Sequence, residues 1–180
     1  MPTSVTGTST SNPRARGFTL IELLVVVLII GITLSVALLT VRGGGEARLA
    51  QDEIHRLERL VGLAADESVY RLIELGLEVA RDGYRFLVWD GTEWIPLPEP
   101  GPLREHHWPD ALAPLLTVEA KPIAVPPRFD ADEPVPQIVF LSSGEVSAFT
   151  LELVAPGGVG ERLQVFITAE TEREPIGQAP

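Results

Sequence analysis

Hydrophobic and polar residues divide this chain into a long apolar block, a helical stripe and a series of short alternating segments. The apolar block begins at Phe18, and no residue from Leu23 to Val41 is charged. Counted from Phe18 it holds 24 residues. As a helix this block is about 36 Å long, enough to cross a bilayer core of about 30 Å. We therefore predict a membrane-spanning helix over residues 18–41.

The next segment, residues 42–75, is predicted to continue as an amphipathic helix. Its apolar residues recur at alternating spacings of three and four, which places them on one face of a helix. They are Ala47, Ala50, Ile54, Leu57, Val61 and Ala64. Gly76 is expected to end the helix, because glycine readily takes the left-handed conformation found after helix C-termini.

Short segments of β-forming residues follow Gly76 and predict a β-rich domain over residues 76–169. Asp82-Gly83 is a strong hairpin signal between two such segments. The expected strands are Leu77–Ala80, Tyr84–Trp89, Glu93–Ile95, Thr117–Ala120, Gln137–Leu141, Ser147–Leu153 and Arg162–Thr168. Many prolines between Pro96 and Pro136 predict long loops. The polar residues 170–180 are predicted to be a disordered tail.

One long helix followed only by strands indicates an α+β fold. The transmembrane half of the helix would precede its amphipathic half. The amphipathic half would pack on an antiparallel sheet or on a two-sheet globular domain. Part of its apolar stripe could also face neighbouring molecules, and the sequence leaves both arrangements open.

Charge is distributed unevenly along the chain. Residues 1–17 contain Arg14 and Arg16 and no acidic residue, which favours a cytoplasmic N-terminus and a single-pass topology. The rest of the chain carries 12 basic and 25 acidic residues. A domain this acidic repels phosphate backbones, so we expect no nucleic-acid partner.

Two features distinguish the apolar block from a plain anchor or an ordinary signal peptide. Glu22 lies near its start, although a carboxylate at the centre of a bilayer costs about 2.5–3.5 kcal/mol. The Gly17-Phe18 junction lies directly between the basic residues and the block. An ordinary secretory signal has a shorter apolar core and a small-residue cleavage site after it, which this chain lacks.

The segment Arg16-Gly17-Phe18-Thr19-Leu20-Ile21-Glu22 resembles the processing motif of type IV pilins and type II secretion pseudopilins. The resemblance implies that prepilin peptidase removes residues 1–17 as a leader by cutting between Gly17 and Phe18. It implies N-methylation of Phe18 and a role for Glu22 in filament assembly. Cleavage would expose an amine that a neighbour's Glu22 could pair with, which offsets the cost of burying either charge alone.

The chain departs from these families at the end of the apolar block. Many pilins have a helix-kinking proline there, whereas this chain has Ala37-Leu38-Leu39. Gly43-Gly44-Gly45 could supply flexibility instead, because glycine weakens a helix.

The β-rich half is similar to the GspH/FimT family. The supporting segments are residues 83–88, Trp94-Ile95-Pro96-Leu97, and residues 138–145 before Phe149. This resemblance implies a minor pseudopilin at the tip of the periplasmic pseudopilus of a type II secretion system, acting in protein export. It implies an inner-membrane precursor with a periplasmic domain. The implied partners are prepilin peptidase, other major and minor pseudopilins, and the inner-membrane assembly platform.

A minor pilin of a type IV pilus, similar to FimT or FimU and binding DNA during uptake, is the alternative. It predicts a basic patch near the C-terminus. Residues 168–174 contain three glutamates and one arginine, which argues against it.

No group of residues predicts catalysis, so we expect neither an enzyme nor a cofactor. His106 and His107 are adjacent, and neighbouring histidines rarely bind one metal; His55 lies far away in the sequence. Asp130, Asp132 and Glu133 could hold calcium but lack an ordered calcium-ligand pattern. Ser142-Ser143-Gly144 lacks the glycine-flanked serine of a nucleophile elbow and predicts a turn. We therefore predict no metal site, and a membrane-tethered enzyme is not favoured.

Overall fold

The computed structural model describes residues 19–98 and 100–177, with the side chains of residues 34–44 left out. The chain divides into two units, Met1–Thr40 and Val41–Pro180. Helix α1, Leu20–Arg71, passes through both. The predicted segments 18–41 and 42–75 thus contribute to a single helix, and residues 43–45 are helical within it. The predicted leader, residues 1–17, lies outside the described residues.

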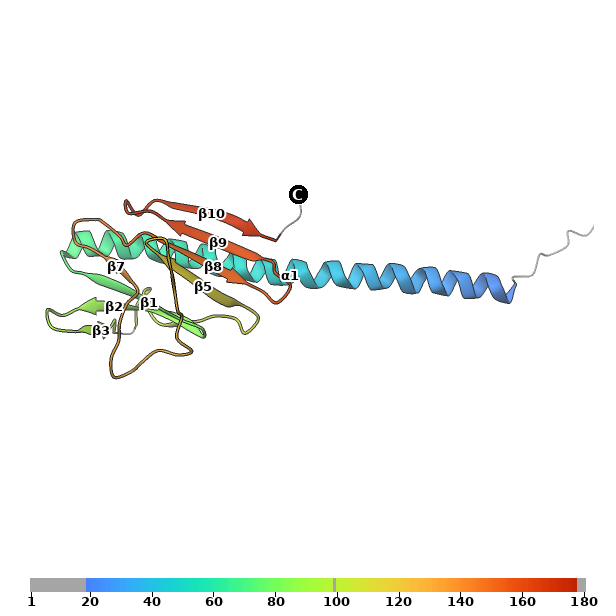
Figure 1. Cartoon of the computed structure of the whole chain (residues 1–180), viewed down its shortest axis with the longest axis horizontal. Coiled ribbons are helices and arrows are strands. Elements are labelled where there is room, and N and C mark those ends of the chain that lie inside the picture. The colour runs from blue at the N-terminus through green and yellow to red at the C-terminus, as the bar shows by residue number, and fades with distance from the viewer. Residues whose placement is uncertain (1–18, 99, 178–180) are drawn as a thin grey trace, which may run out of the picture. The chain divides into compact units, whose positions relative to one another are not determined.

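The second unit contains two antiparallel sheets, which confirms the predicted α+β fold (Figure 1). One sheet has the order β3-β2-β1-β7, with β4 also paired to β2, and the other has the order β10-β9-β8-β5-β6. The strands are β1 (Leu75–Ala80), β2 (Gly83–Trp89), β3 (Trp94–Pro96), β4 (His106–His107), β5 (Ala113–Val118), β6 (Lys121–Ile123), β7 (Ile138–Phe140), β8 (Phe149–Val154), β9 (Gly160–Val165) and β10 (Thr171–Ile176).

The predicted apolar stripe of α1 forms the centre of the core. Five of its residues are completely buried: Ala50, Ile54, Leu57, Val61 and Ala64. They belong to one cluster with buried side chains of both sheets, including Leu77, Phe86, Ile138, Leu151 and Leu163. The stripe therefore packs on the chain's own strands within the second unit. Ala47, the first residue of the predicted stripe, is half-buried.

The prediction that Gly76 ends the helix is wrong. Helix α1 ends at Arg71, and Gly76 pairs with Leu87 inside the sheet as part of β1. A side chain cannot fit there, since an added Cβ would lie 2.6 Å from Pro136 Cβ and 3.1 Å from Trp94 Cζ3. Gly76 therefore allows the backbone of β1 to lie close to Pro136 and Trp94.

The predicted hairpin is present, but its turn lies one residue earlier than Asp82-Gly83. β1 pairs with β2 up to the Ala80–Gly83 pair, so Arg81 and Asp82 form the turn and Gly83 begins β2. The proline-rich region is more ordered than predicted, because it contains β4 and β6. The strand expected at Thr117–Ala120 is displaced. β5 ends at Val118, and Glu119 and Ala120 form a turn in which both residues have positive φ.

The prediction of a disordered tail over residues 170–180 is wrong for residues 171–176. They form β10, which pairs with β9 along its whole length. Glu58 of α1 holds β10 at two points. Thr171 donates a hydrogen bond to Glu58 Oε1 over 2.8 Å, and Arg173 Nε lies 2.9 Å from Glu58 Oε2. Residues 178–180 lie outside the described part of the chain.

Candidate functional site

The described chain begins at Thr19, directly after the predicted processing junction. Gly17 and Phe18 lie outside the described residues. Thr19 Oγ1 accepts a hydrogen bond from the Glu22 backbone N–H over 3.3 Å, and the Thr19 carbonyl accepts from Glu22 and Leu23. Thr19 is therefore the N-cap of α1. Glu22 lies in the first turn, where the helix dipole favours a carboxylate.

Thr19 is the residue of this segment that sequence reasoning missed. Threonine followed three residues later by glutamate is the capping-box spacing. That signal was available in the motif, and it could have located the first residue of α1.

Residues 20–32 of α1 expose a continuous set of large apolar side chains. Their exposed fractions range from 44% at Val26 to 81% at Leu20. The set comprises Leu20, Ile21, Leu23, Leu24, Val25, Val26, Val27, Leu28, Ile29, Ile30 and Ile32. An apolar surface of this extent marks a site that another apolar surface covers.

Within residues 19–98 and 100–177, no helix meets the length and hydropathy needed to cross a membrane. Part of the predicted span, residues 18–41, lies outside the described side chains.

A buried ion pair lies within the sheet that contains β1 and β2. Glu78 and Arg85 are directly opposite in the register, and Arg85 Nε is 2.7 Å from Glu78 Oε2. Burial raises the pKa of Glu78, and the hydrogen bond and positive charge of Arg85 oppose that rise. Arg85 also donates a hydrogen bond to the Asp130 carbonyl, and its guanidinium lies 4.7 Å from the centre of the Phe129 ring.

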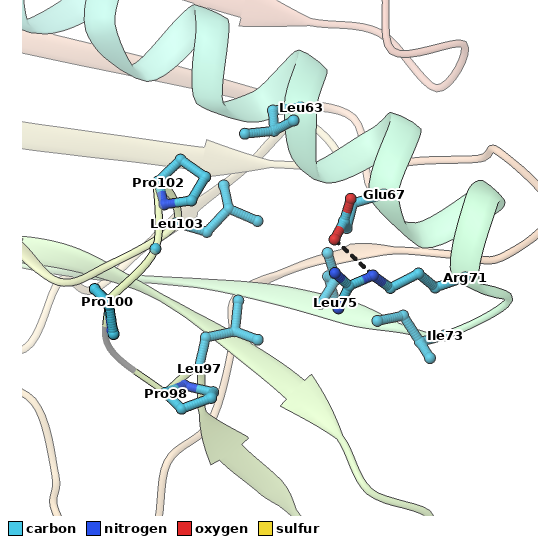
Figure 2. Close-up of a pocket in the computed structure, with 11 residues that line it drawn as sticks. Leu63, Glu67, Arg71, Ile73, Leu75, Leu97, Pro98, Pro100, Pro102 and Leu103 are labelled. Atoms are coloured by element: carbon cyan, nitrogen blue, oxygen red, sulfur yellow. Dashed lines mark ion pairs between the residues drawn. The ribbon is translucent and has the colours of Figure 1, made fainter.

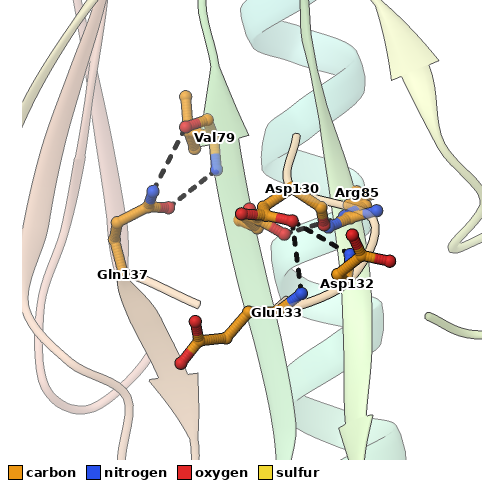
Figure 3. A network of polar contacts seen from close by, with 7 residues as sticks. Val79, Arg85, Asp130, Asp132, Glu133 and Gln137 are labelled. Atoms are coloured by element: carbon orange, nitrogen blue, oxygen red, sulfur yellow. Dashed lines mark hydrogen bonds and ion pairs between the residues drawn. The ribbon is translucent and has the colours of Figure 1, made fainter. Parts of the chain in front are cut away.

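The loop between β6 and β7 is fixed at a second point by Gln137. Its side-chain amide accepts from the Val79 N–H over 2.7 Å and donates to the Val79 carbonyl over 3.3 Å (Figure 3). Asp130 Oδ1 accepts hydrogen bonds from the backbone N–H groups of Asp132 and Glu133. Asp130 thus closes a local turn, and the loop has a structural explanation without a bound cation.

The two adjacent histidines have different surroundings. His106 Nε2 lies 2.7 Å from Glu53 Oε2 and so joins β4 to α1. The His106 ring is 5.3 Å from the ring of Tyr84, and burial raises the pKa of Tyr84 to about 12. His107 is exposed and lies 3.5 Å from Glu105. Among the residues that the structure describes, no group of three His, Cys, Asp or Glu side chains is arranged to hold a metal ion.

A cavity of about 290 Å³ lies between the end of α1 and residues 97–103 (Figure 2). Its lining is mostly leucine and proline, with one ion pair at its edge, Glu67 Oε1 to Arg71 Nε at 2.7 Å. This lining offers apolar contact and does not bring together a nucleophile, a base and an anion-stabilising group, which is the arrangement that hydrolytic chemistry requires.

Known proteins resemble both the N-terminal segment and the whole chain. Residues 12–38 match the family model described as the prokaryotic N-terminal methylation motif. The type II secretion system protein H of Pseudomonas aeruginosa is 32% identical over 158 residues, which cover 84% of this chain and 90% of that protein. The Escherichia coli K12 protein of the same name is 28% identical over 160 residues, which cover 86% and 89%.

Two solved structures share the fold. The minor pseudopilin EpsH from the type 2 secretion system of Vibrio cholerae has a TM-score of 0.60 at 18% identity, covering 73% of this chain and 99% of that chain. The solution structure of Escherichia coli GspH has a TM-score of 0.56 at 21% identity, covering 74% and 93%.

Together these likenesses decide between the two filament systems. The family model spans both residues of the predicted junction and Glu22. Both sequence relatives are secretion-system proteins, so the type IV pilus alternative is not favoured. The chain belongs to the type II secretion system protein H family, and it shares its fold with EpsH and GspH.

Proposed function

We propose that the chain is made as a precursor, cut by prepilin peptidase between Gly17 and Phe18, N-methylated on Phe18, and assembled through α1 into the periplasmic pseudopilus. The observation that carries this proposal is the exposed apolar surface of residues 20–32, which begins directly after the junction. The methylation-motif match over residues 12–38 supports the same junction.

Before assembly, residues 18–41 would anchor the precursor in the inner membrane as a single span. Arg14 and Arg16 favour a cytoplasmic leader, which places the domain from residue 42 onward in the periplasm. Lipid would cover the exposed apolar side chains of this segment at first. In the filament, apolar helices of neighbouring subunits would replace the lipid.

Glu22 would set the register of each added subunit. Thr19 fixes the start of α1, so the carboxylate of Glu22 is held in the first turn. The amine that cleavage exposes on Phe18 of a neighbouring subunit would pair with it. Within an apolar bundle either charge alone is strongly unfavourable, so this pairing selects one axial position.

The subunit's role would be structural rather than enzymatic, with no cofactor. Its partners would be prepilin peptidase, the other major and minor pseudopilins, and the inner-membrane assembly platform. We propose that it is a minor pseudopilin at the pseudopilus tip, a role supported by the fold it shares with the minor pseudopilin EpsH.

Processing is tested by mass spectrometry of the chain produced with and without prepilin peptidase. With the peptidase, the mature protein is expected to start at Phe18 and to carry one added methyl group. The peptidase-free sample should keep residues 1–17. A mature form that keeps these residues in both samples, or that starts beyond the apolar segment, would refute the proposed processing.

The role of Glu22 is tested separately by comparing Glu22→Ala with Asp52→Ala. Both substitutions remove a carboxylate from α1, but Asp52 is exposed in the second unit and serves as a matched control. Glu22→Ala is expected to be processed normally and to be lost from filaments, whereas Asp52→Ala is incorporated. Normal incorporation of Glu22→Ala would exclude the pairing.

A further inference from the structure

Helix α1 ends in a C-terminal cap whose left-handed position is usually occupied by glycine. The Ile73 N–H donates to the Ser68 carbonyl over 3.1 Å, and the Leu72 N–H donates to the Val69 carbonyl over 3.4 Å. This pair of hydrogen bonds is the Schellman motif, in which the residue after the helix takes the left-handed conformation. Here that residue is Leu72, with φ of 55°. A leucine is disfavoured there because its Cβ crowds the following carbonyl.

Little of the Leu72 side chain packs against the described chain to offset this strain. Leu72 is 78% exposed, and its neighbours Tyr70 and Val69 are 86% and 45% exposed. Positive φ also occurs at three other described residues that are not glycine: Glu119, Ala120 and Ala169. These three lie in turns between paired strands, where hairpin geometry favours that conformation. Leu72 alone among these residues combines a strained backbone with a large exposed apolar side chain.

We propose that Val69, Tyr70 and Leu72, here named the 69–72 surface, are a docking site for the globular domain of a different pseudopilin. An aromatic side chain beside an aliphatic one is typical of the residues that dominate binding energy at an interface. The proposal rests on the assembly proposed above and adds the surface that selects a neighbour. Its occupant presents an apolar patch bordered by basic residues.

The charges around the 69–72 surface determine which partner fits. Residues 66–74 contain three carboxylates, on Asp66, Glu67 and Glu74, and one guanidinium, on Arg71. Arg71 pairs with Glu67, as Figure 2 shows, so the remaining charge around the surface is negative. A second copy of this chain, with net charge −11, would place like charges opposite each other. A subunit with a basic border meets complementary charge.

The test uses the full chain in detergent and, as probes, each of the other pseudopilins of its secretion system, purified singly. Binding and melting temperature are measured for Leu72→Gly, Leu72→Ala and the control Leu115→Ala, whose leucine is 57% exposed on β5. Leu72→Gly should raise Tm by about 2–4 °C because the backbone strain is relieved. Both Leu72 variants should bind one probe about tenfold more weakly, the loss typical of an interface anchor. Leu115→Ala should bind like the unmodified chain.

The results separate this inference from the proposed function. If the unmodified chain binds no other pseudopilin, the proposed assembly fails and this surface fails with it. If it binds and both Leu72 variants bind equally well, only the 69–72 surface is wrong. A lower Tm for Leu72→Gly would also overturn it, because leucine would then be serving the fold. Self-association that Leu72→Ala abolishes would overturn the choice of partner.

Discussion

The ion pair between Glu78 and Arg85 predicts a large, pH-dependent loss of stability in Arg85→Met. The two side chains are 5% and 8% exposed, and their charged atoms are 2.7 Å apart. Methionine fills much of the arginine's volume but leaves the Glu78 carboxylate without its partner. Breaking one side of a buried pair typically costs about 3–5 kcal/mol. We expect a loss in this range at pH 7, measured by urea unfolding of the full chain in detergent.

The direction of the pH dependence follows from the pKa of Glu78. Burial already raises this pKa above its ordinary value of 4.5, and Arg85 holds the rise back. Removing Arg85 raises the folded-state pKa further, so the folded variant takes up a proton more readily than its unfolded chain. The contribution of Glu78 to the stability of Arg85→Met should therefore be greatest below pH 4.5. It should fall as pH rises through the raised pKa of the folded state.

Two further variants make the experiment decisive. Arg162→Met removes a more exposed guanidinium, which pairs with Glu152 and Glu174, and should cost about 0–1 kcal/mol. Combining Arg85→Met with Glu78→Leu should recover part of the lost stability, because no buried charge remains. A loss below about 1 kcal/mol for Arg85→Met, or one that does not change with pH, would refute this description of the pair.

Three other substitutions test separate parts of the fold. Gly62→Ala should stabilise the chain by about 0.5–1 kcal/mol, because Gly62 lies inside α1 with open space around an added Cβ. Equal or lower stability of the variant in thermal unfolding would contradict this. Gly76→Ala should destabilise it by about 1–3 kcal/mol through the clash with Pro136, so an unchanged Tm would contradict the close approach. Tyr70→Phe leaves Tyr84 as the single tyrosine, and its hydroxyl should titrate near pH 12 when followed by ultraviolet absorbance. The stability of this variant should fall as pH rises from 10 to 12, because the unfolded chain loses this proton at a lower pH than the folded chain. A titration midpoint near pH 10 would show that the ring is not buried.

The parts of the fold that the sequence predicted correctly depend on local patterns. The stripe from Ala50 to Ala64 follows from helical periodicity alone, and all five of its residues that were expected in the core are buried there. The β1–β2 hairpin was predicted from the local Asp82-Gly83 signal, and its two turn residues are Arg81 and Asp82. Neither feature requires knowledge of a distant partner.

The errors arose where a distant residue decides the local structure. β10 is polar and mostly exposed, and its position against α1 depends on Glu58, which lies 113 residues from Thr171. Gly76 carries a helix-ending signal, but Pro136 and Trp94 need it inside a strand. The left-handed residue that does follow α1 is Leu72, which no propensity rule would select.

The candidate site was accessible from the sequence for a different reason. Its chemistry is carried by consecutive residues, from the junction at Gly17 to Glu22, so spacing alone was informative. The 69–72 surface had no such signal. Val69 and Tyr70 extend a helical sequence, and Leu72 attracts notice only when its φ and its exposure are known together.

In the assembly proposed above, axial register and the choice of partner would depend on different residues of this chain. The exposed apolar side chains of residues 20–32 are leucine, isoleucine and valine, whose packing is favourable but non-directional. Such a surface tolerates sliding and pairs equally well with any apolar helix. Glu22 is the charged residue within the apolar block, so it can distinguish one axial position from the next. It cannot distinguish one pseudopilin from another, because every subunit cut at the same motif presents the same amine. In the proposed assembly, selection of a particular neighbour would therefore involve the second unit, where the strained and exposed Leu72 lies.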